Sequence, residues 1–185
     1  MTLLLIVLAV VIFGFVLVYN SLVGARGQAQ NAWAQIDVQL KRRFDLIPNL
    51  VETAKAYLKH EQGTLEAVMK ARSAAMTSMQ SPTLNASTVK HAQAFEGALG
   101  KLMAVVEGYP ELKADANMRH LTEELVSTEN RIGFSRQAYN DGATAYKIAL
   151  QSFPNNLVAK LFSFSELPLW EMEDKAERHN PRVSF

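Results

Sequence analysis

Charged side chains of both signs gather in residues 37–45, DVQLKRRFD. On a helix, Asp37, Lys41 and Asp45 share one face at i, i+4 and i+8, and Arg42 and Arg43 flank that row. One interpretation is a ladder of ion pairs on a solvated face, in which each pair contributes about a few tenths of a kcal/mol. The other is a recognition surface whose charged groups pair with another helix or another subunit. Polar groups suited to such pairing occur later in the sequence, at Glu123, Glu124, Glu129, Asn130 and Arg131.

Residue types that serve catalysis are present, but not at catalytic spacing. No histidine pairs with another at i+3 or i+4, as a zinc-binding helix requires, and the chain has no cysteine. The sequence also lacks a glycine-rich phosphate loop and a Gly-x-Ser-x-Gly elbow. We therefore predict that the protein is not an enzyme and uses no cofactor or metal. The histidines are His60, His91, His120 and His179.

The distribution of charge along the chain is uneven, although its total is balanced. The 185 residues include 19 Lys and Arg against 18 Asp and Glu, which argues against a nucleic-acid partner bound by bulk basic charge. The first charged residue is Arg26, and residues 3–19, LLLIVLAVVIFGFVLVY, are uninterruptedly apolar. At ~1.5 Å per residue this run spans about 25 Å, enough to cross a thin bilayer. The predicted membrane-spanning residues include Leu3, Ile6, Val10, Phe13, Val16 and Tyr19.

A retained single-pass anchor is the favoured interpretation of this run, against a cleaved signal peptide or a buried core helix. A signal peptide would begin with basic residues, which are missing, although residues 23–25 would serve as a cleavage site. A core helix would show a polar face, and this run has none. Arg26 and the basic residues at 41–43 follow the span, so the positive-inside rule favours a cytoplasmic domain.

Residues 1–20 are expected to form the transmembrane anchor. Residues 21–160 are expected to form an all-α domain, an elongated antiparallel bundle of three or four helices. Residues 20–79 carry apolar side chains at helical spacing, and Pro48 predicts a kink or break near Leu46. After Pro48 the helical pattern resumes from Leu50 to Met76, and Gly63 weakens this second segment without ending it. Because no Pro or linker-like run lies between Tyr19 and Trp33, the anchor can continue directly into the first helix of the domain.

Helix boundaries are indicated further along the chain. Asn85 or Ser87 is expected to begin the third helix, Pro110 to stop it and Asp115 to begin the last one. That last helix has a seam spaced 3, 4, 3, 4 in which large residues alternate with small ones, a pattern that lets a facing helix approach closely. The seam comprises Met118, Leu121, Leu125, Thr128, Ile132, Ser135, Tyr139, Gly142, Tyr146, Ala149 and Phe153.

The C-terminal segment, residues 161–185, changes character partway. An aromatic-rich patch precedes a polar stretch that begins at Glu171. We expect the patch to fold back on the bundle and the polar stretch to be mobile. Together with the charged cluster, these are the predicted interaction residues: Trp33, Asp37, Lys41, Arg42, Arg43, Asp45, Phe162, Phe164 and Trp170.

Several segments together resemble the bacterial LemA family. They are residues 19–23, YNSLV; 32–52, AWAQIDVQLKRRFDLIPNLVE; 107–114, EGYPELKA; 128–132, TENRI; and 139–141, YND. The resemblance covers residues 1 to 164 and leaves out the segment after Glu171. The resemblance implies one transmembrane helix and a helical domain without established catalytic residues. Members of the family are often encoded near membrane proteases. The chain departs from the family pattern at Tyr146, which Lys147 follows where Asn is usual, and the pair Gly142 and Ala143 is unusually small.

Two functions follow as hypotheses. The first is a membrane-anchored scaffold that self-associates into a large homo-oligomer and organises or shapes the lipid bilayer. The second is a regulatory adaptor that binds a membrane protease, a sensor or another membrane protein through the face containing Arg42 and Arg43.

Overall fold

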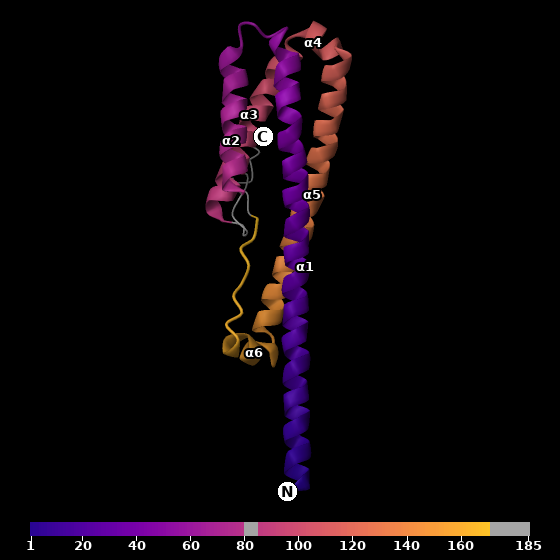
Figure 1. The fold of residues 1–185 in the computed structure, drawn as a ribbon, viewed down its shortest axis with the longest axis vertical. Coiled ribbons are helices and arrows are strands. Elements are labelled where there is room, and N and C mark those ends of the chain that lie inside the picture. The colour runs from indigo at the N-terminus through magenta and orange to yellow at the C-terminus, as the bar shows by residue number, and fades with distance from the viewer. Residues whose placement is uncertain (80–84, 171–185) are drawn as a thin grey trace, which may run out of the picture.

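The computed structural model describes residues 1–79 and 85–170. Within these residues the chain is helical and contains no strand, which confirms the all-α prediction (Figure 1). The polar stretch predicted to be mobile, from Glu171 onward, lies outside the described residues. The helices are α1 (Thr2–Lys55), α2 (Gln62–Ser78), α3 (Ala86–Glu107), α4 (Pro110–Ala114), α5 (Ala116–Gln151) and α6 (Asn155–Leu161).

Helix α1 runs the whole length of the molecule (Figure 1). Helices α2 and α5 run antiparallel to the C-terminal part of α1, and α3 runs antiparallel to α2. Helix α1 packs most closely on α5 and α2 on α3, while the N-terminal stretch of α1 projects beyond them. The apolar side chains of that stretch are exposed, and none of its most apolar 18-residue window is buried by the rest of the chain. The first fully buried residue is Leu22. The expected continuity of anchor and bundle is therefore confirmed.

Of the predicted kink or break near Leu46, the break does not occur, because Pro48 lies inside α1. A proline inside a helix has no N–H to donate to the carbonyl four residues earlier, here that of Phe44. The Nε of Arg72, on α2, donates to that carbonyl oxygen at 2.6 Å. The acceptor freed by the proline is thus satisfied by a neighbouring helix, and the helix continues for seven further residues to Lys55.

The chain reverses instead at residues 56–61, which contain neither Gly nor Pro. The prediction of one uninterrupted segment from Leu50 to Met76 is wrong: its first residues belong to α1, and α2 begins at Gln62. Leu58 is buried in the reversal, and its N–H donates to the Ala54 carbonyl at 2.9 Å. Only by turning back here can α2 bury Leu65 and Val68 against the bundle. Tertiary burial therefore determines this boundary, and no local breaker marks it.

The predicted caps of α3 and α5 are confirmed. The side chain of Asn85 accepts a hydrogen bond from the Thr88 N–H at 2.9 Å, and that of Asp115 accepts one from the Met118 N–H at 3.0 Å. Each satisfies one of the amide groups that a helix start leaves without a partner.

The inner seam of α5 packs on α1 within the same chain. Its large members from Met118 to Tyr146 are buried, as predicted, apart from Leu121, which is half-buried. At Gly142 the two helices come close enough that a Cβ there would lie 3.3 Å from the Ala29 Cα. Phe153 does not belong to the seam, because α5 ends at Gln151 and the Phe153 side chain is 80% exposed.

Candidate functional site

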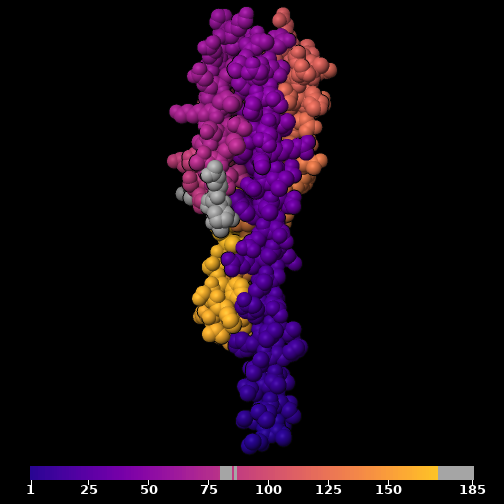
Figure 2. Space-filling view, in the orientation of Figure 1, coloured from indigo at the N-terminus to yellow at the C-terminus, as the bar shows by residue number. Residues whose placement is uncertain are grey.

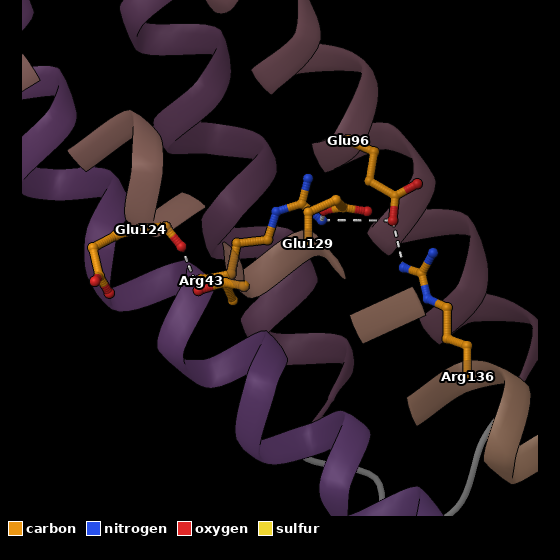
Figure 3. A network of polar contacts seen from close by, with 6 residues as sticks. Arg43, Glu96, Glu124, Glu129 and Arg136 are labelled. Carbon is orange, nitrogen blue, oxygen red and sulfur yellow. Dashed lines mark hydrogen bonds and ion pairs between the residues drawn. The ribbon is translucent and has the colours of Figure 1, made fainter. Parts of the chain in front are cut away.

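A charged network joins α1, α3 and α5 in the middle of the bundle (Figure 3). Arg43 points inward from α1, is 5% exposed, and its Nη1 lies 2.8 Å from Oε2 of Glu129 and 3.6 Å from Oε1 of Glu96. Glu96 also pairs with Arg136 of α5. Two arginines from different helices therefore share the carboxylate of Glu96. Arg42, the neighbour of Arg43, pairs with Glu124 on the more exposed side of the same helices.

The electrostatics of Arg43 reflect burial opposed by its partners. Burial lowers the pKa of its guanidinium, the carboxylates of Glu129 and Glu96 raise it, and the charge of Arg136 lowers it. The guanidinium also lies over the ring of Phe95, 5.2 Å from its centroid. Arginine remains protonated in such a setting because its reference pKa is so high. The network can therefore hold three helices in register.

The row formed by Asp37, Lys41 and Asp45 faces outward. All three side chains are exposed, and no ion pair joins them to one another in the described chain. The ladder of i,i+4 pairs is therefore not formed. The predicted pairing of basic residues with Glu124 and Glu129 is present, but within one subunit. An open groove of about 570 Å³ runs along this row; it is lined by Asp37, Lys41, Phe44, Arg72, Ser73, Met76, Thr77 and Met79.

The C-terminal aromatic patch folds back on the bundle, as predicted. Residues 162–170, which we term the strap, run from α6 back along α1 and α5 (Figure 1). Trp170 is buried, its ring centroid lies 5.7 Å from that of Trp33, and Arg136 lies over it at 4.6 Å. The amide of Asn140 accepts from the Trp170 N–H at 2.8 Å and donates to its carbonyl at 3.1 Å.

Other strap residues bind near the anchor and along α5. The rings of Phe162 and Phe164 lie edge-on to Tyr19, with centroids 4.9 and 5.6 Å away. The hydroxyl of Tyr139 donates to the Pro168 carbonyl at 2.6 Å, and burial raises the pKa of this phenol. The predicted interaction residues Trp33, Phe162, Phe164 and Trp170 are thus brought into contacts within the chain.

Three contributors were missed in the sequence: Glu96, Arg136 and Asn140. Each adjoins a residue recognisable as core, namely Phe95, the seam residue Ser135 and the seam residue Tyr139. A charged or amide side chain next to a core residue could have indicated each of them. The sequence does not show their partners, which come from other parts of the chain. In the described residues, no three metal-ligating side chains come together.

This combination defines a class of protein: a helical bundle joined without a linker to an N-terminal helix that is long and apolar enough to cross a membrane. Residues 32–185 match the family model of the LemA family, and the chain belongs to this family. The match extends to the C-terminus, so the expectation that the resemblance stops before residue 171 was wrong.

Known relatives match different portions of the chain. The chain is 25% identical to protein LemA of Metamycoplasma hominis over 170 residues, which cover 91% of this chain and 76% of that relative. Over 70 residues it is 40% identical to magnetosome protein MamQ 1 of Paramagnetospirillum magneticum, and over 73 residues 34% identical to MamQ of Magnetospirillum gryphiswaldense. The matched part covers 38% and 40% of this chain, and it spans about a quarter (26% and 27%) of these two relatives.

Proposed function

We propose that this protein is a membrane-anchored, non-enzymatic helical scaffold that self-associates into a large homo-oligomer and organises or shapes the bilayer. The observation that carries the proposal is a row of three spaced apolar side chains on the outer face of α5. Val126, Phe134 and Ile148 fall within about 80° of one another at ~100° per residue. All three are exposed, Phe134 by 74%, and exposed polar residues such as Asn130 and Gln137 lie between them. They offer separate contact points for another protein surface rather than one continuous apolar patch.

The continuity of α1 supports a scaffolding role for such association. A contact between two bundles would fix the spacing and tilt of their membrane-spanning segments, because no flexible linker separates bundle from anchor. The core seam of α5 is occupied by α1, so the outer row is the part of α5 left for a second copy.

We further propose a single-pass topology at the bacterial inner membrane, with the bundle in the cytoplasm. Arg26 is exposed directly after the span, and Lys147 and Lys160 lie at the same end of the bundle. Basic residues close to a span favour the cytoplasmic side.

Site-specific cross-linking in native membranes tests the self-association. The chain has no cysteine, so Gln137→Cys, exposed one turn from Phe134, introduces a unique thiol that a short bis-maleimide links only where two copies meet. Ala67→Cys, on the exposed side of α2, is the matched control. We expect cross-linked dimers with Gln137→Cys well above the control. Equal, background yields at both positions would contradict an α5-mediated scaffold.

The groove beside Asp37 and Lys41 favours a second function, an adaptor for a membrane protease or another membrane protein. Docking through Arg43 is disfavoured, because this side chain is committed to Glu129 inside the bundle. The relevant variant is therefore Asp37→Ala with Lys41→Ala, both exposed. Partners captured from membranes should be lost with this variant, and an unchanged set would exclude the groove as the docking site.

A further inference from the structure

Helix α6 has two faces of different kind. Val158 and Ala159 are buried against Leu22 of α1 and Tyr146 of α5. Leu157 and Leu161, four residues apart on the opposite side, are exposed by 52% and 67%. Phe153 before the helix and Phe162 after it are exposed as well. Four large apolar side chains thus protrude together from a helix that is itself firmly packed.

The position of α6 along α1 is the second observation. Phe162 contacts Tyr19, the last residue of the apolar span, and the inner face of α6 packs on Leu22. Figure 2 shows the part of the chain around α6, in yellow, lying against α1 where its projecting stretch begins. A hydrocarbon core of about 30 Å needs about 20 helical residues, so a bilayer crossed by residues 3–19 ends between Tyr19 and Arg26. That is the stretch of α1 on which α6 lies.

The charge around α6 suits a lipid headgroup layer. Residues 142–165 contain Lys147 and Lys160 and no acidic residue. Arg26 is exposed nearby on α1, and the first acid after this segment, Glu166, pairs with Lys147 at 2.9 Å. Lysine beside apolar residues on a short helix is typical of segments that lie in the membrane interface, with the ammonium reaching the headgroups.

We propose that α6 and its flanking residues form a second membrane contact, in which Phe153, Leu157, Leu161 and Phe162 insert into the boundary between headgroups and acyl chains beside α1. The contact rests on α1 crossing the bilayer, but not on self-association. Two points of attachment, one spanning and one interfacial, restrict the tilt of the bundle relative to the membrane plane.

Depth-dependent quenching of the full-length protein tests this contact. Single cysteines at Leu157, Ala67 and Val10 are labelled with an environment-sensitive fluorophore. Each protein is reconstituted into vesicles of phosphatidylcholine and phosphatidylglycerol, with or without a nitroxide high on the acyl chain. Leu157 reports on α6, exposed Ala67 on a bundle surface away from it, and Val10 on the span.

We expect the label at Leu157→Cys to lose about half of its emission to the nitroxide, as for an interfacial helix, and the label at Ala67→Cys to lose almost none. Quenching at Val10→Cys without quenching at Leu157→Cys overturns the second contact and leaves the anchor intact. Quenching at neither position overturns both. A blue-shifted emission at Leu157→Cys without nitroxide quenching also overturns it, because a second copy of the chain then covers α6.

Discussion

The close approach of α1 and α5 at Gly142 makes a sharp prediction, since α5 also carries a matched glycine. A Cβ at Gly142 would meet the Cα, Cβ and backbone N of Ala29 at 3.3, 3.5 and 3.6 Å, whereas a Cβ at Gly133 would have nothing within 4 Å. Both positions are helical, so replacing either glycine with leucine gains helix propensity, worth about 1 kcal/mol. Only at Gly142 must the new side chain enter a packed interface.

Overpacking of this kind costs about 1–3 kcal/mol. We therefore expect Gly133→Leu to raise the free energy of unfolding by up to about 1 kcal/mol and Gly142→Leu to lower it relative to Gly133→Leu by about 1–3 kcal/mol. For a chain of this size the gap corresponds to about 2–12 °C in Tm. Thermal unfolding followed by helical circular dichroism in mild detergent measures it. Equal Tm values for the two leucine variants would refute the close α1–α5 contact.

Three further predictions concern the network and the strap. Arg43→Met should lower the free energy of unfolding by about 1–3 kcal/mol, less than for a fully buried pair because Glu129 is half-exposed. Arg42→Met, at the exposed pair, should lower it by less than about 1 kcal/mol. Equal losses of the two variants in chemical denaturation would contradict the buried network. Asn140→Ala should release Trp170 and shift tryptophan emission to the red, while unchanged emission would mean that the strap is held elsewhere. Because burial raises the pKa of Tyr139 above its reference of 10.0, its contribution to stability is complete below pH 10 and is lost as pH rises through the folded-state pKa. The wild type should therefore lose more stability above pH 10 than Tyr139→Phe, and parallel pH profiles would exclude this role.

Much of the fold follows from local patterns in the sequence. The apolar run, the 3-4 seam of α5 and the caps at Asn85 and Asp115 depend on residues close to one another in the chain, so periodicity and capping chemistry suffice to place them. The pairing of basic residues in segment 37–45 with the acids of segment 123–131 could also be predicted from the sequence, because each group needed an oppositely charged partner.

The remainder depends on contacts between distant residues. Inside α1, the Phe44 carbonyl that Pro48 leaves without a donor is satisfied by Arg72, and nothing beside Pro48 in the sequence indicates this. The reversal at residues 56–61 follows from burial of Leu58. The carboxylate that Arg43 shares with Arg136 belongs to Glu96, which is contributed by another helix. For these features local sequence preferences were not sufficient, and tertiary packing determined where the helices continue, where they end and which side chains pair.

The molar mass of the full-length protein in mild detergent, from light scattering coupled to size exclusion, tests self-association most directly. After subtraction of the bound detergent, we expect a mass many times the 20.6 kDa of one chain, reduced by Phe134→Ser. A single 20.6 kDa chain per micelle would contradict the scaffold.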